Sequence, residues 1–372
     1  MAISLYSKTL RRRRPLSRKT AWQFPGIYSF NAIVTIIPDL PRNIRKVCFS
    51  YFARDTFNVA IDYLAAFKSL TDLKIELSPN LDDRVALVLE PIFCSCPLLE
   101  TLEVSELTGC YGPLPPTAHN LRKLNLTFAA GDIKIDLTWQ YFRRMPNLES
   151  LGIDIHEPYT HDTYTHDTSE DLVEEAGYIP SLRHFETNSL NSALCTVLIH
   201  GNFTLTSLNV DYWRDRPDPP FEMVLAIFNA PALRGLRKLH FCTKSYFNVE
   251  PTLDMSDQIL SAITNLRHLE TLELVMAVCC TSWLKRFAQF SHLKSISLGK
   301  GSIVFDDYNG MMSLNNGMLI AGKKRAYYER HVKPSHPRFQ KLRKDRIAEV
   351  KRRLDYVFSD FDERPCISVR WV

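Results

Sequence analysis

The sequence has no run of 18 consecutive apolar residues, so we predict that it contains no membrane span. Its longest apolar stretch near the beginning, GIYSFNAIVTII, is too short to cross a bilayer. This stretch also lacks the small-residue cleavage pattern of a secretory signal peptide. We therefore expect an intracellular protein, located in the cytoplasm or the nucleus.

Sequence motifs of enzymes and metal sites are missing too. GxGxxG, GxxxxGK, GxSxG and HExxH do not occur, and the nine cysteines form no CxxC pair. We therefore expect no catalytic activity, no cofactor and no metal, and we expect the cysteines to be buried, reduced thiols. The tandem duplication YTHDTYTHDT (159–168) has His and Asp side chains of the kind that bind metals, but a polar surface loop is the simpler interpretation.

What the sequence does contain is a repeat. An apolar residue, two others, an apolar residue, one other and a further apolar residue recur through most of the chain. Ten copies follow this LxxLxL pattern: NIRKVCF (43–49), SLTDLKIEL (69–77), LLETLEV (98–104), NLRKLNL (120–126), NLESLGIDI (147–155), SLRHFET (181–187), TLTSLNVDY (204–212), GLRKLHF (235–241), HLETLELVM (268–276) and HLKSISL (292–298).

The second apolar position of each copy serves as its marker. The markers are spaced 22 to 34 residues apart, which is near the period of a leucine-rich repeat, and they fall at Val47, Leu73, Leu102, Leu124, Leu151, Phe185, Leu208, Leu239, Leu272 and Ile296. The alternation at each marker predicts a short strand with one buried face. Helical periodicity between strands predicts helices in 56–67, 81–93 and 256–263, with Asp82 and Ser256 as N-caps.

These features predict an α/β leucine-rich-repeat solenoid, a horseshoe with parallel strands on its concave side and helices on its convex side, over residues 39–300. The alternative is an ordinary α/β domain with short buried strands. Residues 301–372 are expected to form a basic helix (338–358) and a capping strand from CISVRWV (366–372). The helix either caps the solenoid or contacts nucleic acid or an acidic protein.

Proline or a short polar stretch introduces several copies, as in CPLLETLEV (96–104), MPNLESLGI (145–153) and IPSLRHFET (179–187). These copies resemble the irregular leucine-rich repeats of fungal F-box proteins, over roughly residues 40–300. In that family an F-box docks on the adaptor of a cullin ubiquitin ligase, and the repeats capture the substrate for ubiquitination. Residues 1–40 show no convincing F-box, and LPRNIRKVCFSYF (40–52) fits the first repeat better. The alternative is a protein-interaction scaffold without ligase coupling.

In such a stack the residues one and three after each marker face the concave side. Six of these twenty residues are acidic and Lys74 is the one lysine or arginine among them, so we predict a face of negative potential that attracts a protein with a basic surface. The alternative is that these are ordinary solvated strand positions. The candidate partner-binding residues are Glu76, Glu103, Asn125, Asp154, Glu186, Asn188, Asn209, Asp211 and Glu273.

The two ends of the chain are basic. Residues 1–38 contain seven Lys and Arg and no acid, and 321–353 contain thirteen basic and three acidic residues. Because the whole chain has a net charge of only +5, the remainder carries −12. RRRRPLSRK (11–19) fits a nuclear localisation signal, a nucleic-acid contact, a transit sequence or a solvated tail. We assign 1–38 to a basic, disordered segment, and nucleic-acid association through the basic ends is a further alternative function.

Overall fold

The structure is a computed structural model of the whole chain. It describes residues 21–25, 43–52, 64, 67–77, 86–87, 89–107, 109–110, 116–128, 134–135, 142, 144–155, 179–213, 219–244, 253–275, 278–280, 286–287, 290–299, 302–304, 311–313, 318–320, 348, 352 and 366–370. The contacts within the chain group it into two units, Met1–Thr187 and Asn188–Val372, which are described in turn. The duplicated loop 159–168, the basic segment 11–19 and the proposed N-cap Asp82 lie outside the described residues.

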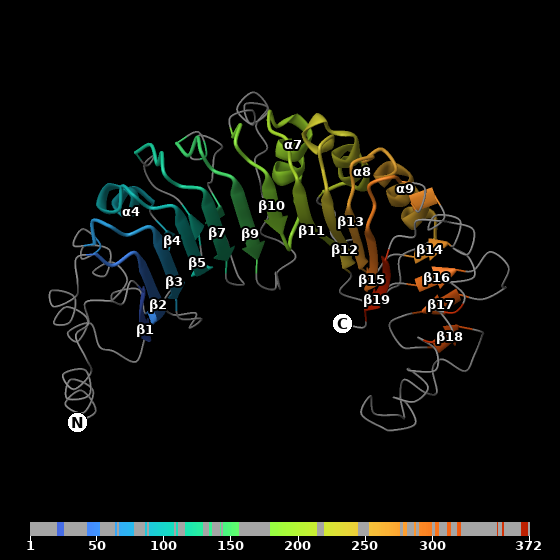
Figure 1. Cartoon of the computed structure of the whole chain (residues 1–372), viewed down its shortest axis with the longest axis horizontal. Coiled ribbons are helices and arrows are strands. Elements are labelled where there is room, and N and C mark those ends of the chain that lie inside the picture. Colours follow the sequence, from blue (N-terminus) through green and yellow to red (C-terminus); the bar gives the residue numbers. More distant parts are fainter. Residues whose placement is uncertain are drawn as a thin grey trace, which may run out of the picture. The chain divides into compact units, whose positions relative to one another are not determined.

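The first unit contains a parallel sheet (Figure 1). Each strand pairs with the strand of the next repeat, and the order is β1 (Ala21–Pro25), β2 (Lys46–Phe52), β3 (Asp72–Leu77), β5 (Thr101–Leu107), β7 (Lys123–Phe128), β9 (Ser150–Ile155) and β10 (His184–Thr187). A small parallel sheet joins β4 (Ala86–Leu87), β6 (Gly109–Cys110) and β8 (Lys134–Ile135).

The second unit contains the same kind of sheet. Its parallel strands are β11 (Ser207–Trp213), β12 (Lys238–Lys244), β13 (Thr271–Val275), β15 (Ser295–Gly299) and β19 (Cys366–Arg370). In Figure 1 the helices of this unit lie on one side of the strands, and they are α7 (Ser192–His200), α8 (Phe221–Asn229) and α9 (Leu253–Ile263). A separate sheet joins β14 (Val278–Cys280), β16 (Ser302–Val304), β17 (Met311–Ser313) and β18 (Met318–Ile320).

The ten markers are all buried, each with an exposed fraction of 2% or less. Within each sheet they also align with one another, so that Leu102, Leu124 and Leu151 are direct register partners in the first unit. The apolar residue three positions before each marker is likewise buried at every copy. This arrangement confirms the predicted leucine-rich-repeat fold, in which each repeat buries its apolar residues against its neighbours.

A repeated backbone contact places each strand beside the one before. The carbonyl oxygen two positions before a marker accepts hydrogen bonds from two successive N–H groups of the next repeat. Arg122, for example, accepts from Glu149 N at 2.8 Å and from Ser150 N at 2.9 Å. Glu270 accepts in the same way from Lys294 N at 2.8 Å and Ser295 N at 3.2 Å. The recurring turn therefore sets the register in which the markers align.

In the second unit, helices pack on the face on which the markers lie. On α8, Phe228 packs edge-on against Phe241 of β12, with ring centroids 5.4 Å apart. Helix α7 begins after Asn191, whose side chain accepts a hydrogen bond from Leu194 N at 2.9 Å. Among the described residues, no helix is long and apolar enough to span a membrane.

The predicted helix boundaries need two corrections. In the segment 81–93 the helix α4 begins only at Leu89 and ends at Ser95, and residues 86–87 form the strand β4. Helix α9 begins at Leu253, so Ser256 lies within the helix and is not its N-cap. In both segments apolar periodicity located a helix but not its first residue, because an N-cap is determined by the local backbone.

The ends of the parallel sheets also differ from the predicted domain boundaries. Residues 21–25 form β1, which pairs with β2, so this part of the segment assigned as disordered is a strand. The predicted final strand from CISVRWV is confirmed as β19, paired in parallel with β15. Within the predicted helix 338–358 the structure describes only Ala348 and Arg352, both helical.

Candidate partner-binding face

Strand alternation gives each sheet a second face, opposite the markers and their helices. We call it the open strand face, and it consists of the residues one before, one after and three after each marker. On β5 and β7 these side chains are half-buried whereas the markers are buried, as the alternating burial of both strands shows. Substitutions on this face leave the apolar core in place, which is why repeat proteins commonly bind partners through such surfaces.

In the first unit the structure brings the predicted acidic and amide residues into two register rows. Glu103 lies beside Asn125, which lies beside Gly152, which in turn lies beside Glu186. Asp154 occupies the next row, as the register partner of Thr127. Glu76 is the partner of Ser105 on β5. The five predicted residues of this unit therefore all lie on its open strand face.

A bulge interrupts these rows on β5. The pairing with β7 advances from Val104 to Leu107 on one strand but only from Leu126 to Phe128 on the other. The extra residue is accommodated at Glu106, whose φ of 64° lies in the left-handed region that favours glycine. The side chains of Leu107 and Phe128 remain buried beyond the bulge. The bulge therefore realigns the apolar residues while displacing the end of the polar row.

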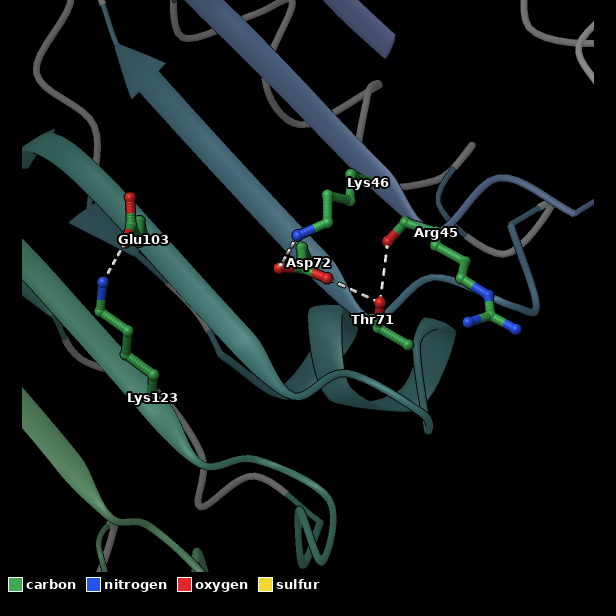
Figure 2. A network of polar contacts seen from close by, with 6 residues as sticks. All are labelled: Arg45, Lys46, Thr71, Asp72, Glu103 and Lys123. Atoms are coloured by element: carbon green, nitrogen blue, oxygen red, sulfur yellow. Dashed lines mark hydrogen bonds and ion pairs between the residues drawn. The ribbon is translucent and has the colours of Figure 1, made fainter. Parts of the chain in front are cut away.

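Lysines one position before the markers offset part of the acidic charge (Figure 2). Lys46 lies 3.0 Å from Asp72 Oδ1, across the pair of strands β2 and β3. The Thr71 hydroxyl lies 2.7 Å from Asp72 Oδ2 and 3.2 Å from the carbonyl oxygen of Arg45. Its single proton is therefore shared between these two acceptors. These contacts connect two repeats at the edge of the face.

Two of the predicted acidic residues are themselves in ion pairs. Lys123 Nζ lies 2.6 Å from Glu103 Oε1, as Figure 2 shows. Lys74 Nζ lies 2.7 Å from Glu76 Oε1, and the hydrogen bond with this carboxylate raises the pKa of the lysine. Among the positions of this face in the first unit, five acids accompany three lysines. The negative potential is therefore weaker than predicted, because the prediction omitted the position before each marker.

Gly152 is buried although it occupies a position predicted to face a partner. A Cβ at this residue would lie 2.7 Å from Asn125 Oδ1, so the Asn125 side chain covers the glycine. Asn125 therefore occupies the space above two adjacent strands, β7 and β9. Cys242 and Ser297 in the second unit are also buried, with exposed fractions of 5% and 7%. These three residues lie on the open strand face but are buried, which corrects the prediction that every such position is exposed to a partner.

In the second unit a histidine lies between two of the predicted acids. His240 Nδ1 is 3.2 Å from Glu273 Oε2 on β13, and His240 Nε2 is 3.9 Å from Asp211 Oδ1 on β11. Asn209 is the register partner of His240, and Asn188 precedes α7. The four predicted residues of this unit thus include three that surround His240.

Sequence reasoning missed the charged residues two positions before the markers. Glu270 lies 2.7 Å from Lys294 Nζ and 3.3 Å from Arg237 Nη1, so a carboxylate joins the cations of the preceding and following repeats. The hydrogen bond from Lys294 lowers the pKa of Glu270. Arg122 and Glu149 form an equivalent pair. At this position the charge alternates from copy to copy between Glu100 and Arg183 and again between Arg237 and Lys294, a pattern in the sequence that would have predicted these contacts.

Asparagines four positions before the markers were also missed. Asn120 donates to the carbonyl oxygen of Pro97 at 2.9 Å, and Asn147 donates to that of His119 at 2.7 Å. At the same position His268 and His292 stack, with ring centroids 6.0 Å apart. These side chains connect the turn of one repeat to the turn before it. The sequence indicated the two asparagines through the dipeptide Asn-Leu, which begins the copies at 120–126 and 147–155.

The described residues contain no group of three or more His, Cys, Asp or Glu that could hold a metal ion. The cysteine side chains that the structure describes form no disulfide. Cys96, Cys195 and Cys242 are buried, Cys48 is half-buried and Cys94 is exposed. Burial raises the pKa of Cys96 to about 12. The open strand face of the first unit offers carboxylates, an amide and lysines in register, and that of the second unit offers carboxylates, an amide and a histidine in register.

No protein-family model matches the chain. No curated protein matches it either. Thirty-three chains of solved structures do match, among them a crystal structure of a TLR13–ssRNA13 complex. The identity with that chain is 14%, the TM-score is 0.31, and the match covers 72% of this chain and 40% of the other. The match therefore spans less than half of that chain, and the leucine-rich-repeat fold of this protein rests on its own strand register and buried markers.

Proposed function

We propose that this chain is a protein-binding leucine-rich-repeat module whose open strand face captures a partner with a basic surface. The observation that carries the proposal is the alignment of polar side chains in register along each parallel sheet, while every marker is buried on the other side. Such an array presents many polar side chains on an extended surface, and these side chains can vary without disturbing the buried core. The small excess of acids over lysines favours a cationic partner, because complementary charge speeds encounter.

The test is a triple charge reversal in the first unit, Glu103→Lys, Asp154→Lys and Glu186→Lys. Partners would be recovered by affinity purification and identified by mass spectrometry, and the affinity of the recovered partner would then be measured directly. We expect the variant to bind roughly tenfold or more weakly, about 1.4 kcal/mol, since like charges then oppose each other at the interface. The difference should diminish as the salt concentration rises.

A matched control carries the same charge change away from the face, with Glu90→Lys, Glu100→Lys and Glu222→Lys. Glu90 lies on α4, Glu222 on α8, and Glu100 in the turn before β5. The control variant should retain wild-type affinity. Equal losses in the two triple variants would show that binding follows overall charge and not the open strand face, and no loss in either would dismiss the face as the binding surface.

The finer proposal is that the module recognises substrates for a cullin ubiquitin ligase. Its support is the resemblance of the repeats introduced by proline, such as 96–104, 145–153 and 179–187, to those of fungal F-box proteins. We expect the chain to co-purify with the ligase adaptor and its captured partner to be ubiquitinated by the assembled ligase. A stable partner without any adaptor would instead identify a stand-alone scaffold.

The alternative to protein capture is association with nucleic acid through the basic ends. The thirteen basic residues within 321–353 motivate it. Binding of this kind would weaken steeply with salt and would be lost on deletion of that segment. Protein capture through the open strand face should survive the deletion. Localisation in the cytoplasm or nucleus, which we also propose, is tested by imaging the tagged chain with and without 11–19.

A further inference from the structure

In the second unit, one row of the open strand face combines a carboxylate with a histidine and a buried serine. It crosses four neighbouring strands at the position after each marker, and its members in register are Asn209, His240, Glu273 and Ser297. Glu273 carries the negative charge of this row, and among these four residues there is no lysine or arginine to balance it. The row is flanked by a second carboxylate, since Asp211 Oδ1 lies 3.9 Å from His240 Nε2.

Ser297 has a hydroxyl group that the fold does not satisfy. Its exposed fraction is 7%, and its Oγ atom finds no hydrogen-bond partner among the residues that the structure describes. Buried polar atoms in proteins are almost always hydrogen-bonded, so an orphaned one needs an explanation. The neighbouring marker Ile296 points into the core, and Ser297 therefore shares the face of its register partner Glu273.

Glu273, on the strand beside Ser297, has its carboxylate held in place by His240. His240 Nδ1 lies 3.2 Å from Glu273 Oε2, which orients the carboxylate from the side opposite to Ser297. Glu273 and Ser297 are direct register partners on adjacent strands, which lie about 4.8 Å apart. A group that carries two N–H donors on one rigid plane can therefore donate to both acceptors at once.

From this arrangement we propose that Glu273 and Ser297, with His240 as a positioning residue, form a subsite for an arginine guanidinium of the protein partner. The guanidinium group has five N–H donors in a rigid fork and keeps its charge, so it can donate to the carboxylate and the hydroxyl together. A lysine ammonium is a compact point charge and matches this pair of acceptors less well. Asp211 adds a second negative charge beyond the histidine. The inference rests on the proposed function and specifies the chemistry that the face recognises.

The experiment uses the full chain with selectively labelled histidine rings, observed by NMR. The His240 signal is assigned with His240→Gln, and the probes are N-acetyl-arginine amide and its lysine and citrulline counterparts. We expect the arginine probe to shift the His240 signal saturably and at least fivefold more tightly than either counterpart. Citrulline keeps the shape of the side chain without the charge, so it separates charge recognition from packing.

Two substitutions test the acceptors. Glu273→Gln should weaken binding of the arginine probe at least tenfold, and Ser297→Ala about fivefold, the effect of one lost hydrogen bond. Ser297→Ala should also leave the denaturation midpoint unchanged or raised, because it removes an unsatisfied buried hydroxyl. A residue with a purely structural role would lower stability and binding together. The matched control is Glu222→Gln on α8, away from the open strand face, which should bind the probe as the wild type does.

Several results would overturn the subsite. They are equal affinity for the arginine, lysine and citrulline probes, an equal loss in Glu222→Gln, or no change in Ser297→Ala. These outcomes are separable from failure of the proposed function, which is measured by partner capture in the charge-reversal variants of the first unit. If capture depends on the face while the arginine probe does not bind at His240, the subsite is wrong and the binding module stands.

Discussion

Truncation of one marker residue gives the most direct test of the repeat architecture. Leu124 on β7 is fully buried and is the register partner of Leu102 on β5 and Leu151 on β9. Leu124→Ala removes three buried carbons, which costs roughly 2.4 kcal/mol of transfer free energy. The cavity that remains brings the expected loss in the free energy of unfolding to about 2–5 kcal/mol.

The measurement is equilibrium unfolding in denaturant together with native-state hydrogen exchange. Because each repeat is stabilised by its neighbours, the amides of β5 and β9 should lose protection along with those of β7. Thr127→Ala, on the open strand face of the same β7, is the control and should cost less than about 1 kcal/mol. If the two variants lose similar stability, or if Leu124→Ala costs less than about 1 kcal/mol, the assignment of markers to a shared core is refuted.

Three further predictions concern single contacts. Gly152→Ala should destabilise the chain by about 1 kcal/mol, because its Cβ would meet Asn125 Oδ1, and the double variant with Asn125→Ala should recover that loss in denaturant unfolding. At pH 8, iodoacetamide should modify the exposed Cys94 well before Cys96, because the buried Cys96 thiol has a pKa of about 12. Site-resolved mass spectrometry measures the two rates, and equal rates would contradict the burial of Cys96. Because the pKa of Glu270 is lowered, its ion pairs stabilise the fold above about pH 4.5, and this contribution disappears as the pH falls further. The denaturation midpoints of wild type and Glu270→Gln should therefore differ at pH 7 and converge in acid.

The strands of the solenoid were predictable because their signal is local. An apolar residue at the marker and another three positions earlier recur in ten copies, and both residues are buried in every copy. The helices were less predictable, since amphipathic periodicity in 81–93 also covers the strand β4. The strand β1 was missed altogether because residues 21–25 contain no LxxLxL copy.

The candidate site was predicted in part. All five predicted residues of the first unit lie on its open strand face, but their electrostatics were not predictable from the positions considered. Lys123 pairs with Glu103 from the next repeat, 20 residues later in the chain, and Lys74 pairs with Glu76 on its own strand. A prediction that had included the residue before each marker would have found the first of these pairs.

Burial of the markers follows from the local spacing of apolar residues. Alternate side chains of a strand lie on opposite faces, so each can be assigned to a face without reference to distant parts of the chain. The amino-acid sequence therefore specified the repeat, the parallel strands and the two faces. Tertiary structure alone decided the bulge at Glu106, the cover of Asn125 over Gly152 and the unsatisfied hydroxyl of Ser297. These depend on strand register and on side chains brought together from other repeats, and no periodicity within one repeat contains that information.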